Sequence, residues 1–226
     1  MARKTKEEAA ATRESVLMAA LDLFSEKGFS RTTFSNIAKR IGMTRGAVYW
    51  HFDNKPALLA ALMDHVHALK ESRVESQIPA IQTIEDLRGA FVLHAQFVES
   101  DPVMHKFEFF LNYQMEWSEE LLTETHKKLK ELRKSPLEDF RNCFNVPAIA
   151  DRIRPNVNLD QLVLTLASFW CGASKIFLGC HYPGKDCGQN SDDDILLLGG
   201  IRLEQMVENG FDLILSGVLK EESGNE

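Results

Sequence analysis

Hydrophobic residues recur at helical spacing along most of the chain. Positions i, i+3, i+4 and i+7 fall on one side of a helix with 3.6 residues per turn, so a stripe of this kind predicts an amphipathic helix. Two clear stripes are Leu17, Ala20, Leu21 and Phe24, and Leu58, Leu62, Val66 and Leu69. Glycine, proline and capping residues separate the stripes. We therefore expect an all-α fold with about nine or ten helices.

Two short helices are predicted between residues 29 and 56. Phe34, Ile37, Ala38 and Ile41 form the apolar stripe of the first. Thr33 can cap its N-terminus and Thr44 can cap the next helix, since a threonine hydroxyl accepts a bond from a free backbone N–H group there. Gly42 can adopt the positive φ that ends a helix and turns the chain. Two helices joined by a tight glycine turn form a helix-turn-helix pattern.

The second helix has the composition of a DNA reader. Arg45 can bond guanine O6 and N7 in the major groove, and Ala47 can pack on a thymine methyl group. The small residue Gly46 lets the backbone come close to base edges. Tyr49 and His51 are then left to reach phosphates, while the opposite face anchors the helix in the core through Val48 and Phe52. The alternative is a buried helical hairpin with no role in nucleic-acid binding.

The stretch TTFSNIAKRIGMTRGAVYWHFDNK resembles the DNA-binding segment of TetR-family repressors, most closely the AcrR-like branch that governs multidrug efflux. The matching features are TT, IA, a glycine, TRGA, YWHF and NK at the spacing of the family. The resemblance covers roughly residues 10 to 66. Met43 and Val48 are apolar variants within it, and Pro56 stands where an acidic residue is usual.

The resemblance implies a role for each matched residue. Arg45 and Gly46 correspond to base contacts, and Trp50 is expected nearby and partly buried. The positions that correspond to phosphate contacts are Thr33, Thr44, Tyr49, His51 and Lys55. For His51 the alternative is a histidine packed between helices. Phosphate contacts set register and affinity, whereas base contacts specify sequence.

We expect two domains. Residues 1–54 would form the DNA-binding domain, with 1–12 as a flexible arm, and residues 55–226 a ligand-binding and dimerisation domain. Its first helix, 55–77, would connect the two. Within 159–218, two segments are apolar nearly all round, from Leu159 to about Leu178 and from Asp194 to Val218. A helix apolar on every side must be buried in a domain centre or a subunit interface, and the resemblance implies a homodimer interface here.

Charge is distributed unevenly along the chain. The formal net charge is −7, but residues 1–55 contain ten Lys and Arg against six Asp and Glu, so this part carries +4 and the rest −11. A basic head on an acidic body suits a protein that binds double-stranded DNA at one end. The sequence shows no signal peptide and no apolar run that would predict a membrane span. We expect a bacterial cytoplasmic protein, associated with the nucleoid when bound to DNA.

Aromatic residues in the second half indicate a pocket for a small molecule. Apolar walls with a few polar groups are typical of such sites. The candidate lining residues are His94, Gln96, Met104, Phe107, Glu108, Phe110, Leu111, Trp170, Ser174 and Phe177. The alternative for each of them is an ordinary core position. The resemblance implies a small apolar or aromatic inducer that releases the repressor from a palindromic operator of an efflux or detoxification operon.

The cysteines offer a second hypothesis for the signal. Three thiols and an imidazole within 17 residues could sense a metal or thiol oxidation: Cys171, Cys180, His181 and Cys187. Their spacing lacks the C-x₂₋₄-C pair of strong zinc motifs, so we expect no bound metal. Motifs for hydrolases, zinc proteases and nucleotide-binding enzymes are also missing from fitting contexts. We expect neither catalysis nor a cofactor.

Overall fold

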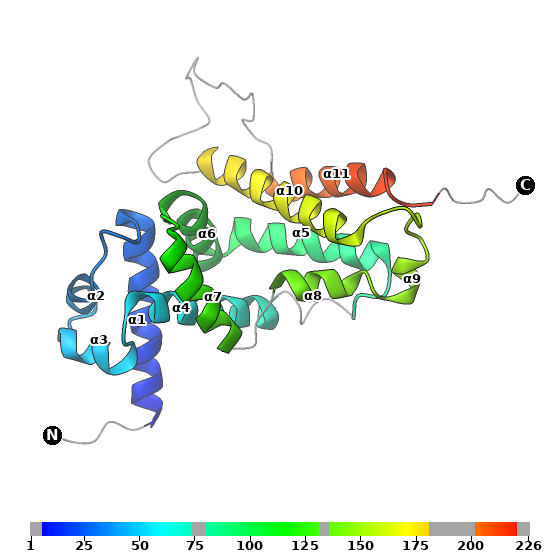
Figure 1. Ribbon diagram of the computed structural model, residues 1–226. Helices are drawn as coiled ribbons and strands as arrows, with labels where there is room; N and C mark the ends of the chain where they lie inside the picture. Colours follow the sequence, from blue (N-terminus) through cyan, green and yellow to red (C-terminus); the bar gives the residue numbers. More distant parts are fainter. Residues whose placement is uncertain (1–5, 74–79, 132–135, 181–201, 221–226) are drawn as a thin grey trace, which may run out of the picture. The chain divides into compact units, whose positions relative to one another are not determined.

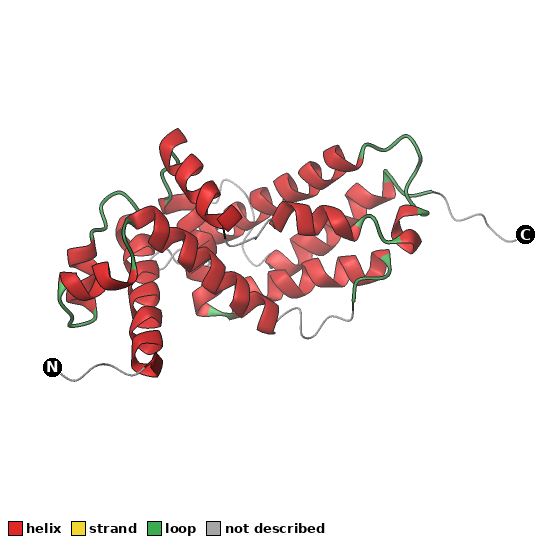
Figure 2. Cartoon of the chain, turned by 60° about the horizontal axis from the view of Figure 1, so that its bottom comes forward, coloured by secondary structure: helices red, strands yellow, loops and turns green. Residues whose placement is uncertain are grey.

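The computed structural model describes residues 6–73, 80–131, 136–180 and 202–220, and the regular elements in these ranges are all helices, without a named strand. Figure 1 labels the α-helices, and Figure 2 shows the loops that join them. An isolated β-bridge between Ile153 and Leu219 is present. The elements are α1 (Lys6–Lys27), α2 (Phe34–Arg40), α3 (Arg45–His51), α4 (Lys55–Arg73), α5 (Ile84–Ser100), α6 (Pro102–Phe109), the π-helix η2 (Phe110–Gln114), α7 (Glu119–Glu131), α8 (Pro136–Cys143), α9 (Pro147–Ala150), α10 (Leu159–Cys180) and α11 (Leu203–Ser216). The all-α expectation is confirmed.

The chain forms two compact units that are discontinuous in sequence. Unit 1 comprises Met1–Leu69 and Val103–Lys134, and unit 2 comprises Lys70–Pro102 and Ser135–Glu226. The expected functional boundary after residue 54 stays a prediction. In the structure, however, most of α4 and nearly the whole segment from α6 to α7 belong to the same compact unit as the N-terminal helices. The two units are described separately below.

Helix α1 begins at Lys6 and continues unbroken to Lys27, so most of the expected flexible arm 1–12 is helical; residues 1–5 lie outside the described part. Glu7 and Glu8 in its first turn oppose the positive end of the helix dipole, and Lys27 opposes the negative end. The predicted stripe is buried: Leu17, Ala20 and Phe24 have no exposed surface. At the C-terminus, Gly28 has φ +86° and its N–H donates to the Phe24 carbonyl.

The helix-turn-helix is built as the sequence predicts. Thr33 caps α2 in a capping box, because its hydroxyl accepts from the Asn36 N–H and the Asn36 side chain accepts from the Thr33 N–H. Gly42 has φ +66° in the turn. Thr44 caps α3 by accepting from the Ala47 N–H at 3.3 Å. The core face of α3 is anchored by Val48, which is fully buried, and Phe52.

The segment from α6 to α7 packs against the N-terminal helices within unit 1. Phe110 of η2 stacks on Phe24 of α1 with ring centroids 5.2 Å apart. The Phe29 N–H donates to the Gln114 carbonyl at 3.2 Å, so the first residue after the α1 turn is bonded to the end of the π-helix. The Lys106 ammonium lies 2.6 Å from the Asp22 carboxylate. The N-terminal helices therefore share one core with residues about 85 positions further along the chain.

Unit 2 is built around α5, α10 and α11, which Figure 1 shows side by side. Its buried core includes Leu87, Phe144, Leu166 and Phe211. Gly210 allows α11 to approach α10 closely, because a Cβ atom there would overlap the ring of Phe169. At the surface, ion pairs join α11 and its N-cap residue to α5: Arg88 binds Asp212 and Glu208, and Arg202 binds Glu99.

The two apolar C-terminal helices are not buried on every side within one chain. Leu164 of α10 is 54% exposed and Leu213 of α11 is 75% exposed. The described part of the second helix begins at Leu203, and its expected start at Asp194 lies outside the described residues. By length and composition, α10 is also the one described helix that could span a membrane, which the sequence did not lead us to expect. Only 39% of its most apolar window is buried.

Candidate DNA-binding surface and ligand site

The exposed face of α3 carries a pre-arranged arginine. The Arg45 guanidinium donates to the Tyr49 hydroxyl at 2.9 Å and lies over the Tyr49 ring, 5.1 Å from its centroid. The Tyr49 ring is itself held by an edge contact with Phe34 of α2 at 4.8 Å. Two helices thus fix the direction of one arginine. A cation held in this way loses little rotational freedom on binding a base or phosphate.

The first turn of α3 is open to approach. Thr44, Arg45 and Gly46 are exposed and Ala47 is half-buried. A Cβ atom at Gly46 would meet nothing nearer than the Thr44 hydroxyl at 3.8 Å, so the glycine does not mark a crowded position. The hydroxyl of Thr44 accepts the capping bond and keeps its own proton available as a donor. The free N-terminus of α3 can therefore come close to a groove or a phosphate.

The exposure of Trp50 differs from the expectation. It is 73% exposed, more than most large hydrophobic side chains of the protein, whereas partial burial was expected. The reason is helical geometry. Val48 and Phe52 face the core, and Trp50 lies about half a turn from each of them, so its side chain points away from the core. His51 is half-buried and contacts the rings of Trp50 and Phe52, with centroid distances of 4.6 and 6.3 Å. Its packing agrees with the alternative that the sequence left open, and a phosphate contact stays a prediction.

Lys55 is occupied within the protein. Its ammonium donates to the carbonyls of Phe29 at 2.8 Å and Ser30 at 3.2 Å, and lies 4.4 Å from the centroid of the Phe29 ring. Burial lowers the pKa of Lys55, and the charge of Glu116 partly offsets this. The lysine ties the start of α4 to the turn after α1. With two of its three N–H donors used, a phosphate contact would have to come from the third.

Sequence reasoning missed the roles of two polar residues that position these helices, Thr32 and Asn36, and it predicted Asn54 only as the mark of a helix start. Thr32 is fully buried and its hydroxyl reaches the carbonyls of Leu23 and Gly28. Asn36 completes the capping box of α2. Asn54 accepts from the Ala57 N–H at the start of α4 and donates to Glu124 of α7. The T/S-x-x-N spacing was visible for Thr33 and Asn36. The bonds of Thr32 to Gly28 and of Asn54 to Ala57 are local, whereas the bonds to Leu23 and Glu124 depend on the tertiary fold.

The ligand-site candidates fall into both units. Met104, Phe107 and Phe110 are buried in unit 1, where Phe110 fills the core against α1. In the same segment Leu111 and Glu108 are half-buried, and the Glu108 carbonyl accepts from the Asn112 side chain. For Phe110 the contacts favour the alternative of a core position.

The candidates in unit 2 form a more unusual cluster. The rings of His94 and Trp170 stack at 4.5 Å with 12° between their planes. Ser174, one turn after Trp170 on α10, is fully buried. Neither His94 Nε2 nor Ser174 Oγ has a hydrogen-bond partner within the described residues. Phe177 is buried on the same helix and Gln96 is half-buried on α5.

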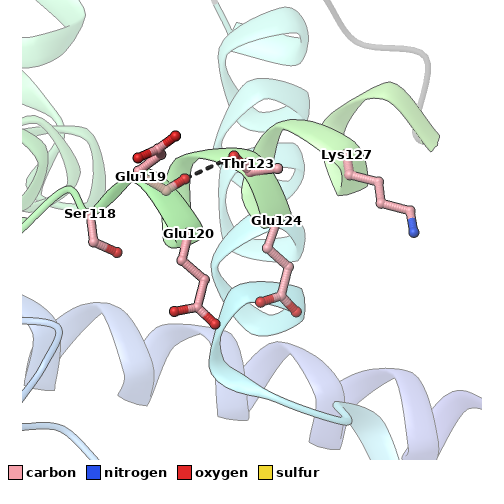
Figure 3. Close-up of a pocket in the computed structure, with 6 residues that line it drawn as sticks. All are labelled: Ser118, Glu119, Glu120, Thr123, Glu124 and Lys127. Atoms are coloured by element: carbon pink, nitrogen blue, oxygen red, sulfur yellow. Dashed lines mark hydrogen bonds between the residues drawn. The ribbon is translucent and has the colours of Figure 1, made fainter.

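A surface hollow in unit 1 is of a different kind. It is lined by polar residues of the first turns of α7 and the residue before them: Ser118, Glu119, Glu120, Thr123, Glu124 and Lys127. Glu120 and Glu124 point to the same side of the helix in Figure 3. The lining has no aromatic residue and is largely acidic, so it does not match the apolar pocket expected for an inducer.

The cysteine hypothesis finds no support. Among the described residues, no group of three or more His, Cys, Asp or Glu side chains could hold a metal ion. Cys171 is exposed on α10 and Cys180 is half-buried at its end, and neither forms a disulfide. His181 and Cys187 lie outside the described residues.

Comparison with known proteins agrees with the helix-turn-helix. The family model of bacterial regulatory proteins, tetR family, matches residues 16–62. The probable acrEF/envCD operon repressor of Escherichia coli K12 is 31% identical over 176 residues, which are 76% of this chain and 78% of that protein. The regulator TtgR of Pseudomonas putida is 38% identical over 119 residues, covering 48% of this chain and 57% of its own length.

A solved structure supports the fold over nearly the whole chain. NalD, the secondary repressor of the MexAB-OprM multidrug efflux pump in Pseudomonas aeruginosa, superposes with a TM-score of 0.70. The match covers 95% of this chain and 98% of NalD at 23% identity. The family match at the helix-turn-helix and the long alignment with the E. coli repressor lead to one conclusion: this chain belongs to the tetR family of bacterial regulatory proteins.

Proposed function

We propose that this protein is a ligand-responsive transcriptional repressor that binds a palindromic operator as a dimer and is released by a small-molecule inducer. The observation that carries the DNA-binding part is the exposed α3, with Arg45 fixed by Tyr49 and an uncrowded first turn. Arg45 and Gly46 would meet base edges, and Ala47 a thymine methyl group. Thr33, Thr44, Tyr49, Trp50 and His51 would flank them at the phosphates. Being regulators, members of this family act by binding rather than by catalysis.

Dimerisation is supported by the apolar side chains that one chain leaves exposed on α10 and α11. Leu164, Ile176 and Leu213 are each more than a third exposed. Pairing these faces across a two-fold axis would bury them and place two α3 helices toward successive major grooves, about 34–36 Å apart. The same axis explains why the operator would be a palindrome.

The inducer would act by shifting a population between two arrangements of the DNA-binding helices. A ligand shifts such an equilibrium only if it binds one arrangement more tightly than the other. Helix α4 begins at Lys55 in unit 1 and its last residues, from Lys70, belong to unit 2, so it is a covalent path between them. We propose that inducer binding moves α4 and makes the spacing of the two α3 helices unsuitable for the operator.

The target operon would encode an efflux or detoxification system. Similarity to an acrEF/envCD operon repressor and a fold shared with a repressor of MexAB-OprM support this assignment. DNA-binding regulators of this family work in the cytoplasm, and the protein would join the nucleoid when bound.

The deciding experiment is fluorescence anisotropy of the purified protein on its own upstream intergenic DNA and on a scrambled duplex, over a salt series. We expect tight binding that weakens steeply with salt, with a preference of at least about a thousandfold for the native duplex. Equal affinity for the two duplexes at every salt concentration would contradict sequence-specific regulation. Tyr49→Ala, which removes the contact that holds Arg45, serves as the reduced-affinity control.

A further inference from the structure

The last turn of α4 is held by an ion pair within unit 2. The Arg73 guanidinium donates to the Asp101 carboxylate, and it also lies over the Phe97 ring, 6.0 Å from its centroid. Phe97 and Asp101 are one turn apart at the end of α5, and the Asp101 N–H donates to the Phe97 carbonyl. Arg73 therefore contacts the end of α5 through both a carboxylate and an aromatic ring.

The Asp101 carboxylate is buried, whereas Arg73 is exposed. Asp101 is only 9% exposed, and a buried carboxylate is stable only when a cation or several hydrogen-bond donors balance it. The last turn of α5 has no basic residue of its own, so α4 supplies the positive charge. Proline at position 102 fixes where α5 ends, because the residue before a proline avoids helical dihedrals. The carboxylate thus has a fixed place in unit 2, and Arg73 reaches to it.

The same turn of α5 also holds the start of α11. Arg202, the N-cap residue of α11, makes no side-chain cap bond. The half-buried Glu99 caps the helix instead, because its carboxylate accepts from the Glu204 N–H at 3.0 Å and from the Arg202 guanidinium at 3.1 Å. Two carboxylates two residues apart therefore join the end of α5 to α11 and to the last turn of α4.

Helix α11 is fixed against α5 along its length. Leu87 of α5 and Phe211 of α11 belong to one buried core, and Arg88 binds Asp212 at 2.8 Å. Figure 1 shows the two helices side by side. Leu213, on the face proposed for dimerisation, is carried by α11. The end of α5 is therefore a fixed point relative to that face, and α4 is fastened to it.

We propose that Asp101 is a positioning residue for operator binding, which sets the direction of α4 relative to the dimer face by holding Arg73. Helix α4 has no glycine, and its only proline, Pro56, is in the first turn, so its sequence marks no kink between Lys55 and Arg73. In a two-fold dimer the directions of the two α4 helices set the spacing of the two α3 helices. This inference rests on the proposed function, and it assigns Asp101 an effect through Arg73 rather than through a DNA contact.

The first test is fluorescence anisotropy on three duplexes from the protein's own upstream intergenic DNA. One carries the native palindrome, and the others have one base pair added or removed at its centre. One base pair changes the half-site separation by about 3.4 Å and turns one half-site by about 35° relative to the other. The native chain should bind the native spacing most tightly.

Asp101→Asn keeps the shape of the side chain and removes its charge. The preference for the native over the altered spacings should fall by about threefold to thirtyfold. The affinity for a duplex with a single half-site should stay the same, because α3 and its contacts are unaltered. A purely stabilising residue would not change the spacing preference in this selective way.

Two further variants separate positioning from stability. Arg73→Met leaves the buried carboxylate without its cation and lowers stability, whereas the double variant Arg73→Met/Asp101→Asn removes both charges. The double variant should melt at the same temperature as Asp101→Asn and show the same relaxed spacing preference. Arg141→Met is the matched control, because it removes another exposed arginine of unit 2, paired with Asp160 between α8 and α10. It should leave the preference unchanged.

The second test needs no DNA. Amide hydrogen exchange of the full-length protein is followed by mass spectrometry in peptides from Met63–Arg73 and from α10. In Asp101→Asn, exchange in Met63–Arg73 should rise by about threefold to thirtyfold, because the last turn of α4 loses its hold. Exchange in α10 should stay at the native rate, and Arg141→Met should not change exchange in Met63–Arg73.

Several outcomes would overturn the proposal. Unchanged exchange in Met63–Arg73 would do so whether or not the protein binds DNA. An unchanged spacing preference in both Asp101→Asn and the double variant would also do so, as would an equal loss on every duplex including the single half-site. A native chain without a spacing preference would refute the dimeric repressor function and with it the role of Asp101 at the operator, while the exchange result would still confirm or refute the hold on α4.

Discussion

The Lys55 ammonium lies 2.8 Å from the Phe29 carbonyl oxygen and over the Phe29 ring, so the first residue of α4 is fastened to the turn that follows α1. This contact fixes where α4 leaves the DNA-binding helices. It also changes what a substitution of Lys55 is expected to do, since the family resemblance alone implies a phosphate contact.

Lys55→Met should lower the free energy of unfolding by about 1–2 kcal/mol, because the carbonyls of Phe29 and Ser30 lose their donor in a partly buried position. Operator affinity should fall with it. The slope of log K against log salt should stay the same, whereas loss of one phosphate contact would reduce it by about one. Chemical denaturation and anisotropy over a salt series measure the two quantities. A slope reduced by about one would restore the phosphate assignment.

Arg45→Ala should weaken operator binding by about 1–3 kcal/mol and relax specificity at one base step. Tyr49→Phe removes the hydroxyl that accepts from Arg45 but keeps the ring beneath it, so its effect should be smaller and similar on operator and scrambled DNA. Because the two side chains contact each other, the double variant should lose less than the sum of the single losses. Fluorescence anisotropy of each variant on operators with single base changes measures both the loss of affinity and the loss of specificity. Equal loss on operator and scrambled DNA for Arg45→Ala would remove its base-reading role.

His94 should make the protein less stable in mild acid. Its pKa is lowered in the folded state, so below its ordinary value of 6.5 the unfolded chain takes up a proton that the folded chain does not. Stability therefore falls as pH falls below 6.5, by up to about 1.4 kcal/mol per pH unit for this one group. His94→Phe should gain up to about 2 kcal/mol relative to the native chain between pH 7.5 and pH 5, measured by urea denaturation. A difference that does not vary with pH would show that the pKa of His94 is the same in the folded and the unfolded chain.

Gly210→Ala should destabilise the protein, because the new methyl group overlaps the Phe169 ring where α11 crosses α10. Overpacking of this kind costs about 1–3 kcal/mol. Gly89→Ala is the matched control, since it lies in α5 with nothing within 4 Å of the added carbon; it should be neutral or stabilising by up to about 1 kcal/mol. Phe169→Leu in the Gly210→Ala background should recover part of the loss. Thermal melts that rank the two alanine variants the other way would contradict the close packing.

Leu213→Lys should weaken the proposed dimer while leaving the single chain folded, since Leu213 is 75% exposed within one chain. Two symmetric copies would each lose about 1.5–3 kcal/mol of burial, so the dimer dissociation constant should rise by at least about a hundredfold. Sedimentation equilibrium measures it. Leu137→Lys, at a position of α8 that is 48% exposed, is the control and should leave association unchanged. A Leu213→Lys protein that remains as tight a dimer would show that this face is not the interface.

The local features of the fold were predictable from the sequence. Thr33, Gly42 and Thr44 each occupy the cap or turn position that their chemistry predicts, because capping depends on residues within one turn. The exposure of Trp50 could also have been derived, since Val48 and Phe52 already fix the buried face of α3. The start of α1 at Lys6 was missed because its first turns are polar and show no stripe.

Long-range relationships were not predictable in this way. The aromatic residues of α6 and η2 indicate that one face of this segment is buried, but they do not say that Phe110 will meet Phe24, 86 residues earlier. The π-helix Phe110–Gln114 was missed for a related reason: an i→i+5 turn leaves no mark in a pattern read at 3.6 residues per turn. The orphan state of Ser174 depends on a side-chain rotamer, which no spacing rule specifies. Trp170 and Ser174 were among the ligand-site candidates that the sequence offered, but the stack of Trp170 with His94 required the tertiary fold.

The pairing of Phe24 with Phe110, and of the Phe29 N–H with the Gln114 carbonyl, bears on how such repressors can be recombined. A chimera made by a single crossover after α3 or α4 would graft the DNA-reading helices onto a foreign α6–α7 segment and open their shared core. Transplanting the operator preference of this protein intact requires two exchanged segments, residues 1–69 and 103–134. Modularity in this chain therefore follows its compact units rather than its sequence order.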